Sequence, residues 1–511
     1  MVSQPVSSAN PQKTLVATVS KPTAASVRVG TRMVHAIAWT GAAIWATQLI
    51  TWGYMIMVAR MLAPSDYGLI GMANIPLGFL TIASQFGVGY AVITMPNLTP
   101  YQVSQLNTVS VLCGLMLFTI SCFVAYPLGY FFRTPDLPMV IIALSLGVVI
   151  TSFKTIPDAL LQREFRFKLL GQIQAVQAIG YGFAAAIGLL LGAGYWSLVI
   201  ASLTDATLST LLTLYSRRHA FAWPKLEDLR GSLVFSTYIL GLRVAWYCNS
   251  NADFAVAGRV LGQAALGSYN IAWNIAQQPL QKLTDLVQRV VPSYFSNFQS
   301  DYAALREYVL TLTAALSLLT LPATLGLAAV ADELVAVALG PKWINAVPVL
   351  RMLALWAAAR SITSFFTPLL NATGESRFVM WNHMLSALCF TAAFYLGSRW
   401  GIVGIAVVWP VLHPFFAVPL CFRACKQINV RWRRYWASVR PALSASAVML
   451  VCLALFKKAL LSSSPIYLRL AAEMITGAGT YCLTLLVLHR GELRRAYHLF
   501  RSATSLNQIV S

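Results

Sequence analysis

Ten ionisable side chains lie inside long apolar stretches of this 511-residue chain, and they are the first candidates for chemistry. A charged side chain at the centre of a bilayer costs about 2.5–3.5 kcal/mol on insertion scales, so each one needs a partner or a function. The five cations suit an anionic ligand, but five carboxylates at similar depth predict an interior without net positive charge. The ten residues are Lys154, Arg243, Lys282, Arg351, Arg360, Asp158, Asp205, Asp253, Asp285 and Glu473.

Arg360 and Arg243 are the stronger candidates for an anion. Trp356 precedes Arg360 by one helical turn, so the guanidinium can stack on the indole and still present donors to a ligand. Arg243 has Tyr247 within about 40° of its direction on the same helix, and a structural contact explains it equally well. Arg351 points about 180° away from Arg360, so we expect at most one of these two to face a given cavity.

Two pairs of opposite charge have the spacing of neighbours on a helix. Lys154 and Asp158 are four residues apart, so a structural ion pair explains them as well as a ligand does. Arg469 and Glu473 have the same spacing near a predicted helix end, where an ion pair without further function is favoured.

One predicted helix, 267–288, has a polar stripe along one side. Six amide and carboxylate side chains fall within about 60° of one helical line, and Lys282 flanks that line. Interhelical hydrogen bonding, at about 0.6–2 kcal/mol per amide, needs only one or two such residues. A stripe of this length therefore favours the wall of a water-filled cavity. The stripe comprises Asn270, Asn274, Gln277, Gln281, Asp285 and Gln288.

The composition indicates a membrane protein with many spans. Hydrophobic residues make up 58% of the chain and charged residues only 10%, against roughly 25% charged in soluble domains. The net charge of +21 comes mostly from Lys and Arg beside apolar runs, which is the positive-inside pattern, so we expect no nucleic-acid partner. Neither the eight cysteines nor the six histidines have metal-ligand spacing, so we expect no metal site and no cofactor.

Apolar runs of about 20 residues predict fourteen transmembrane helices and an all-α polytopic fold. With the N-terminus in the cytoplasm, 24 Lys and Arg lie on the cytoplasmic side, 8 on the other and 5 within spans, so both termini are predicted to be cytoplasmic. The predicted spans are 35–58, 68–93, 106–131, 137–160, 169–192, 195–216, 232–256, 267–288, 308–331, 346–370, 378–398, 401–422, 441–461 and 468–488.

Two short patterns recur and indicate a duplication of six spans. Arg60, Leu62, Gly68 and Ala73 recur 199 residues later, and Pro157, Glu164, Arg166 and Phe167 recur 211 residues later. Because six is even, the copies have the same orientation, which makes a parallel repeat with a site at its interface. The predicted domains are a disordered basic tail 1–34, lobes 35–218 and 232–424, a linker 219–231, a basic loop 425–440, an extra helix pair 441–488 and a cytoplasmic tail 489–511.

The stretch RMLAPSDYGLIGMA at 60–73, QFGVG at 85–89 and ALLQREFRFK at 159–168 carry a family resemblance. They resemble the Wzx-type polysaccharide and O-antigen flippases, the polysaccharide-transport branch of the multidrug/oligosaccharidyl-lipid/polysaccharide exporter superfamily. The likeness runs from about residue 35 to the last span. It implies two six-helix lobes around a central cavity and a transporter without catalytic residues.

The resemblance also implies a cargo and a place in the cell. The cargo is an undecaprenyl-pyrophosphate-linked oligosaccharide, moved across the bacterial cytoplasmic membrane for exopolysaccharide, capsule or O-antigen synthesis. Implied partners are membrane lipids and the polysaccharide polymerase and chain-length machinery, with transport driven by an ion gradient, the membrane potential or the lipid's own gradient. The pyrophosphate candidates are then Arg243, Arg360, Lys282, Lys154 and Arg351, and the amide stripe becomes the candidate sugar path.

Other functions fit the sequence less well. A multidrug exporter of the same superfamily is the main alternative, since only the cavity chemistry separates it from a flippase. A membrane glycosyltransferase or polymerase needs a larger outer loop than 332–345, whose acidic pair Asp332 and Glu333 we interpret as a solvated turn. No phosphate-binding GxxxxGK[ST] loop occurs in the chain, which excludes an ATP-driven pump within it.

Overall fold

The computed structural model describes residues 48, 50–85, 89, 92–93, 98–164, 166–225, 247, 250–288, 302–459 and 465–490. Residues 50–61 are helical and precede α2 (Pro64–Gln85), α4 (Pro100–Phe132), α5 (Leu137–Ser152), α6 (Thr155–Arg163), α7 (Phe167–Leu190) and α8 (Trp196–Ser216). There follow α10 (Ala252–Val256), a π-helical turn (Ala257–Leu261), α11 (Gln263–Gln288), α13 (Tyr302–Ala329), α14 (Ala331–Ala338), α15 (Ala346–Thr363), α16 (Phe366–Ala372), α17 (Ser376–Gly397), α18 (Gly401–Gln427), α19 (Trp432–Ala459) and α20 (Ile466–Leu488).

All regular structure in these residues is helical, which confirms the predicted fold class. Nine helical stretches within the described ranges are long and apolar enough to cross a membrane, and a bent pair, α5 with α6, makes a tenth. One of the nine, 376–427, contains both α17 and α18. The predicted first and seventh spans lie largely outside the described residues, so the count of fourteen stays a prediction.

Proline breaks the fourth span of each half at the same place. α5 and α6 meet at a bend of 46°, and Pro157 is the third residue of α6. Pro368 is likewise the third residue of α16, just after the end of α15. Because proline has no N–H and its ring clashes with the carbonyl four residues back, the helix is interrupted before it. The recurring proline therefore follows a helix boundary in both copies, but of these two boundaries, both among the described residues, only α5–α6 bends by more than 40°.

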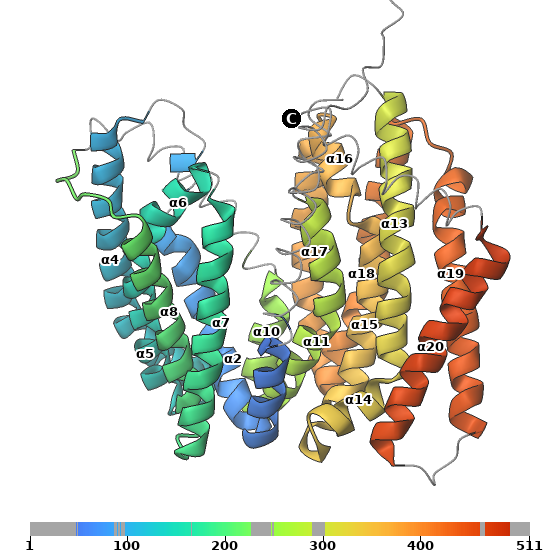
Figure 1. Ribbon diagram of the computed structural model, residues 1–511, viewed down its shortest axis with the longest axis horizontal. Helices are drawn as coiled ribbons and strands as arrows, with labels where there is room; N and C mark the ends of the chain where they lie inside the picture. Colours follow the sequence, from blue (N-terminus) through green and yellow to red (C-terminus); the bar gives the residue numbers. More distant parts are fainter. Residues whose placement is uncertain are drawn as a thin grey trace, which may run out of the picture.

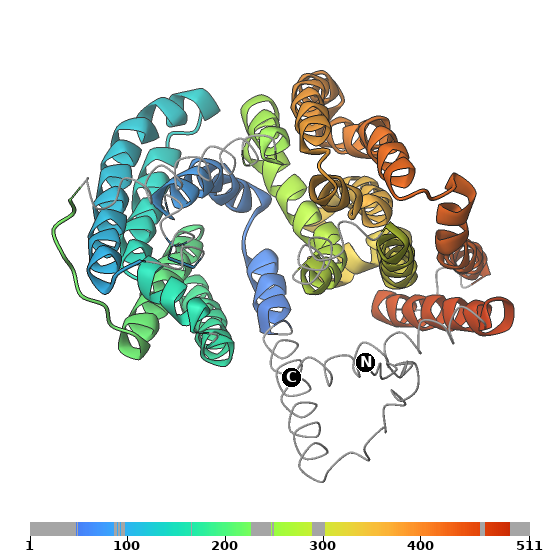
Figure 2. The ribbon, with the colours of Figure 1, turned by 90° about the horizontal axis from the view of Figure 1, so that it is seen from above.

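The helices form two groups (Figures 1 and 2), which come together near one end (Figure 1). The first group contains residues 50–61 and α2 to α8, and the second contains α10 to α18 with α19 and α20 added at its side. We call the end with α6 and α16 the α16 end, and the opposite end the α14 end. From the junction near the α14 end, the ribbons of the two groups diverge toward the α16 end (Figure 1).

Two glycines let α2 and α11 cross closely where the groups meet. A methyl group on Gly68 would lie 1.8 Å from the Gln263 carbonyl oxygen, and one on Gly267 would lie 1.9 Å from the Pro64 carbonyl oxygen. Only glycine allows backbones to approach this far. Each of these repeat glycines packs on the residue four positions before the other, so the contact is pseudo-symmetric.

The first helix also forms hydrogen bonds with the second group at the α14 end. Trp343 Nε1 donates to the Ala59 carbonyl oxygen at 2.8 Å, and Lys342 Nζ donates to the Arg60 carbonyl oxygen at 2.6 Å. The Arg60 guanidinium in turn donates to the last carbonyls of α14, at 2.9 Å for Ala338. We call these five residues the polar clasp. It ties the two groups together through side chains that bond backbone carbonyls.

The repeat places a different contact at the equivalent position of the other half. Gly258 and Arg259 correspond to Ala59 and Arg60, and a methyl group on Gly258 would lie 3.0 Å from the Phe132 ring. The Arg259 guanidinium carbon lies 5.3 Å from the centroid of Phe131. We call Phe131, Phe132, Gly258 and Arg259 the aromatic clasp. One clasp is thus polar and the other is packed on rings.

Equivalent ion pairs mark the α16 end of each half. Glu164 lies 2.9 Å from Arg217, and Glu375 lies 3.1 Å from Arg423. Both pairs connect the end of the fourth span to the end of the sixth span of their half. Exposed ion pairs of this kind contribute only about 0–1 kcal/mol to stability. Their equivalent positions show instead that the two halves have the same arrangement at this end.

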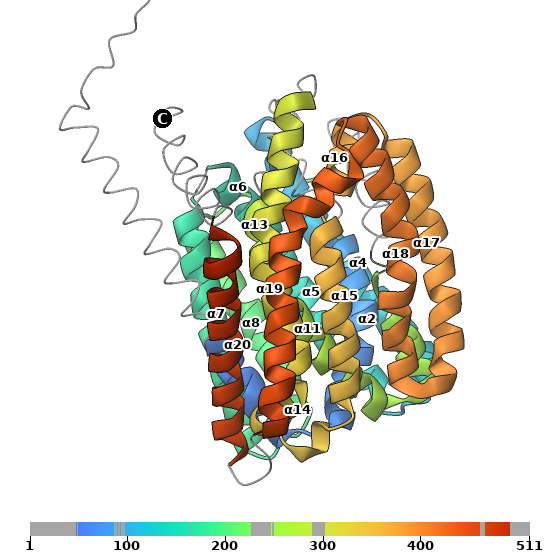
Figure 3. The ribbon, with the colours of Figure 1, turned by 90° about the vertical axis from the view of Figure 1, so that its right-hand side faces the viewer.

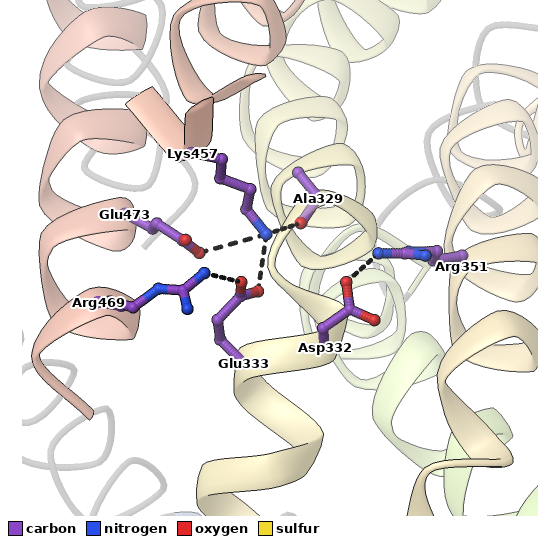
Figure 4. Close-up of polar contacts among 7 residues, drawn as sticks. All are labelled: Ala329, Asp332, Glu333, Arg351, Lys457, Arg469 and Glu473. Carbon is purple, nitrogen blue, oxygen red and sulfur yellow. Dashed lines mark hydrogen bonds and ion pairs between the residues drawn. The ribbon is translucent and has the colours of Figure 1, made fainter. Parts of the chain in front are cut away.

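A buried ion cluster attaches the extra helices α19 and α20 to α14 (Figures 3 and 4). Lys457 Nζ lies 2.7 Å from Glu333 and 3.5 Å from Glu473, and Arg469 lies 3.4 Å from Glu333. The predicted ion pair between Arg469 and Glu473 is therefore wrong. Arg469 pairs with Glu333 of α14, and Glu473 pairs with Lys457 of α19. The predicted solvated turn at Asp332 and Glu333 is also wrong, since both residues lie in α14 and Glu333 is only 5% exposed.

Candidate functional site

The amide side of α11 lies where the two groups of helices face each other. α11 crosses α2, and Gln48 of the first helix donates to Gln278 at 3.3 Å. Asn274 and Gln281 are exposed and Asn270 is half-buried, whereas Ile271 on another side of the helix is fully buried. Exposed amides are costly against hydrocarbon. This part of the stripe therefore requires water or protein beside it.

The stripe has internal structure that the sequence did not predict. Asn274 Nδ2 donates to Asn270 Oδ1 at 2.9 Å, one turn back on the same helix. Gln277 is only 2% exposed and turns toward α15 instead of the open space. The side chains of Lys282, Asp285 and Gln288, as well as Arg243, lie outside the described residues.

Arg360, Trp356 and Gln277 form a group of donors beside this stripe. The Arg360 guanidinium carbon lies 5.2 Å from the Trp356 ring centroid, which confirms the predicted stacking. Arg360 Nη1 donates to Gln277 Oε1 at 3.4 Å. Gln277 Nε2 and Trp356 Nε1 are buried and have no hydrogen-bond partner among the residues that the structure describes. We call these three residues the donor cluster.

The donor cluster presents the kind of groups that an anionic ligand needs. A guanidinium, an amide N–H and an indole N–H all donate. No carboxylate in the described ranges forms an ion pair with Arg360, which is exposed although it lies on a membrane-spanning helix. His413 lies beside the cluster, with its ring 6.3 Å from that of Trp356 and its Nε2 3.1 Å from Thr363 Oγ1.

An aromatic layer supports the donor cluster from within the second group. The Trp409 ring lies 4.2 Å from the Trp356 ring, and Trp273 lies 5.3 Å from Trp356. Under this layer, Tyr269 donates to Asp253 at 2.7 Å and Trp409 Nε1 donates to Asp253 at 3.2 Å. Asp253 is fully buried. These packed rings fix the rotamer of Trp356 and hence the position of Arg360.

Sequence reasoning named Asp253 but missed its partners. Tyr269 and Trp409 are 16 and 156 residues away from it. No local spacing connects residues that far apart, because three elements, α10, α11 and α18, must first pack together. The only available signal was the presence of an acidic residue inside an apolar run, which demands buried donors.

Two other cations predicted for the anion site lie elsewhere. Arg351 pairs with Asp332 near the α14 end (Figure 4), away from Arg360 as the helical spacing predicts. Lys154 lies in the break between α5 and α6 and donates to Ser209 Oγ at 2.7 Å. Asp158 instead accepts from Gln162 at 3.0 Å. The predicted Lys154–Asp158 pair is replaced because Ser209 of α8 accepts from the ammonium group. The turn between the two residues is helical, since the Asp158 N–H donates to the Lys154 carbonyl oxygen at 2.8 Å.

The described residues hold no group of three or more His, Cys, Asp or Glu that could bind a metal ion. All the described cysteines are free. The site thus consists of hydrogen-bond donors, amides and aromatic rings, a composition suited to binding an anionic, hydroxyl-rich molecule.

Comparison with known proteins places this geometry in context. A family model described as "Polysaccharide biosynthesis protein" matches residues 57–348, more than half of the chain. The chain is 25% identical over 361 residues to the lipopolysaccharide biosynthesis protein WzxC of Escherichia coli K12, covering 69% of this chain and 73% of WzxC. It is 24% identical to the teichuronic acid biosynthesis protein TuaB of Bacillus subtilis, covering 88% of this chain and 94% of TuaB.

Solved structures share the fold. The lipid II flippase MurJ in an inward closed conformation superimposes with a TM-score of 0.70 at 12% identity, over 89% of this chain and 100% of that one. An inward-facing transporter of the multidrug resistance MATE family gives a TM-score of 0.60 at 14% identity, over 75% and 94%. The chain is a multi-pass, all-helical membrane protein, and by its family match it belongs to the polysaccharide biosynthesis protein family.

Proposed function

We propose that this protein is a flippase for lipid-linked oligosaccharide. The donor cluster carries this proposal, because three donors, two of them buried and without acceptors, match the oxygens of a pyrophosphate. The amide side of α11 beside it matches sugar hydroxyls. The chain's family and the roles of its relatives in lipopolysaccharide and teichuronic acid biosynthesis support the same cargo class.

The structure corresponds in this proposal to a state closed at the α14 end. The glycine crossing and the two clasps hold the groups together there, and the ribbons diverge toward the α16 end (Figure 1). Because 24 of the 37 Lys and Arg fall on the side of the α16 end in the predicted topology, we assign that end to the cytoplasm, with both termini. The cargo then enters from the cytoplasmic leaflet and leaves at the α14 end.

The reaction involves no covalent step, so the protein acts by alternating access. Binding of the pyrophosphate at the donor cluster satisfies donors that otherwise remain unpaired, while the polyprenyl tail stays in the bilayer. An ion gradient, the membrane potential or the gradient of the lipid drives the cycle, and a polymerase with its chain-length machinery consumes the product. Cationic drugs, the cargo of the alternative exporter reading, do not suit a site made of donors.

Export of polymer by cells that depend on this protein tests the proposal. Arg360→Ala is expected to reduce export about tenfold or more, since hydrogen bonds to charged groups are worth about 1.5–3 kcal/mol. Arg360→Lys keeps the charge but loses the planar fork, so it should restore export only in part. Arg399→Ala, an exposed cation at the α14 end, is the matched control. Normal export by Arg360→Ala at wild-type protein level would remove the donor cluster from the transport path.

A further inference from the structure

A second site with a different chemistry lies on the outside of the second group. A groove of about 420 Å³ runs along the first turns of α19 at the α16 end. Its lining includes Trp432, Arg433, Trp436, Arg440 and Ser444, and we call it the α19 groove. Nothing in the transport cycle proposed above uses it.

The two arginines of the α19 groove are free to bind an anion. Arg433 and Arg440 are exposed, and neither forms an ion pair with any residue that the structure describes. Their neighbours differ, because Arg434 pairs with Glu307 at 2.7 Å. Arg433 and Arg440 are two turns apart, about 10 Å along the helix, so two long side chains can converge on one headgroup.

The position of the α19 groove is that of a membrane interface. Trp432 and Trp436 are 40% and 41% exposed, and tryptophan is enriched where the hydrocarbon meets the headgroups. Further along α19, within about 60° of the same helical direction, Val451 and Leu455 are 59% and 62% exposed. A molecule in the groove thus contacts two arginines at one end and the exposed apolar side of α19 along the rest of its length.

The terminal tails of the chain do not match this site. Residues 1–34 contain four Lys and Arg and no acidic residue. Residues 490–511 contain four Arg and a single Glu. Both tails carry net positive charge, so neither complements the pair of arginines.

We propose that the α19 groove binds the phosphate headgroup of an acidic phospholipid in the leaflet at the α16 end. Arg433 and Arg440 bind the phosphate oxygens, the indoles of Trp432 and Trp436 lie at the glycerol level, and the acyl chains follow the exposed apolar side of α19. The proposal is independent of the flippase assignment, because it concerns a lipid that stays in place.

Lipid retention by the purified full-length protein tests this site. The protein is exchanged into mixed phosphatidylglycerol and phosphatidylcholine, and the phosphatidylglycerol bound per molecule is titrated. Near an anionic surface each arginine is worth about 1 kcal/mol, or about fivefold in affinity, so Arg433→Gln with Arg440→Gln should weaken binding about 30-fold. Arg431→Gln, an exposed arginine of the same segment outside the groove, should leave binding within about twofold.

Three outcomes overturn the proposal. Phosphatidylglycerol binding by the double variant at the wild-type level is the first. Loss of as much binding by Arg431→Gln as by each groove variant is the second, because it indicates surface charge only. Loss of polyprenyl phosphate binding with normal phosphatidylglycerol binding would assign the groove to a prenyl lipid. Equal thermal stability of all variants is required, and Arg360→Ala should retain phosphatidylglycerol, which separates this test from that of the flippase assignment.

Discussion

The Arg360 guanidinium rests on an indole and lies beside two buried N–H groups without acceptors. An unsatisfied buried polar group costs about 1–3 kcal/mol, so donors left unpaired in a packed interior indicate an acceptor supplied from outside. An anionic acceptor suits the cluster, because the Arg360 guanidinium forms no ion pair with a carboxylate of the described residues. Gln277, whose Oε1 accepts from Arg360, is therefore as informative a position as the arginine itself.

Gln277→Glu tests the anion site with almost no change in shape. The new carboxylate replaces the amide oxygen that lies 3.4 Å from Arg360 Nη1, so it should pair with the guanidinium and repel a phosphate. We expect transport to fall at least as far as in Arg360→Ala, about tenfold or more, with unchanged or higher thermal stability. Gln277→Leu, which removes the donor without adding charge, should be milder. Full transport by Gln277→Glu would contradict an anion at this position.

The sequence predicted the residues of the site better than their contacts. Stacking of Arg360 on Trp356 followed from a spacing of one turn on a single helix. Pairing of Arg360 with Gln277 joins residues 83 positions apart, so it needed the packing of α11 against α15. For the same reason the direction of Gln277, away from the stripe, was not predictable from helical angles alone.

At the scale of one element, α11 combines a tight crossing with a polar side. It is less apolar than the long helices that can cross a membrane, because amides replace apolar residues along one side. An element of this kind is stable in a membrane only if its polar side meets water or protein. The structure packs Ile271 inward and leaves Asn274 exposed, in line with that demand.

Thiol labelling along α11 distinguishes its exposed amide side from its buried apolar side. Single cysteines replacing Asn270, Asn274 and Gln281, in a chain without native cysteines, should react with a small aqueous reagent. A cysteine replacing Ile271 should react at least about tenfold more slowly, because that side chain is fully buried. Slow reaction at Asn274 and Gln281 in cells that still export polymer would assign the amides to helix packing.

The crossing of α2 and α11 should be intolerant of a single methyl group. Gly68→Ala or Gly267→Ala places a carbon less than 2 Å from a backbone oxygen of the other helix, and overpacking costs about 1–3 kcal/mol or more. We expect lower thermal stability and lower protein yield for each. Gly479→Ala in α20, where a methyl group meets nothing within 4 Å, is the control. Wild-type stability of both crossing variants would contradict the close approach.

Element boundaries were predictable where local chemistry sets them. The repeated prolines, visible in sequence, break α5 from α6 and α15 from α16. The contact of Lys154 was missed, because its partner Ser209 lies 55 residues away on α8, a separate element. The ion cluster around Lys457 was also missed, since Glu333 reaches it from a separate element.

At the scale of the molecule, the two clasps differ although the halves repeat. The polar clasp consists of hydrogen bonds to carbonyls at Ala59, Arg60 and Ala338, which water can replace. The aromatic clasp packs Phe132 on Gly258 and loses that contact outright if it separates. Opening at the α14 end should therefore begin at the polar clasp, with the aromatic clasp and the glycine crossing serving as the pivot.

Covalent locking distinguishes these two roles. A bifunctional thiol reagent joining cysteines at Arg60 and Lys342 should stop transport, and cleavage of the linker should restore it. The same reagent joining cysteines at Phe131 and Arg259 should leave at least about half of the transport, because a pivot moves little. Equal inhibition by both locks would show that both clasps must open.

The most direct test is flipping by the purified protein in sealed vesicles. Fluorescent undecaprenyl-pyrophosphate oligosaccharide is placed in both leaflets, and its accessibility to an external reagent is followed over time. The wild type should expose the inner pool, and Arg360→Ala should do so about tenfold more slowly at equal protein per vesicle. Exposure by the wild type no faster than by protein-free vesicles, or equal rates for wild type and Arg360→Ala, would contradict a flippase that works through this anion site.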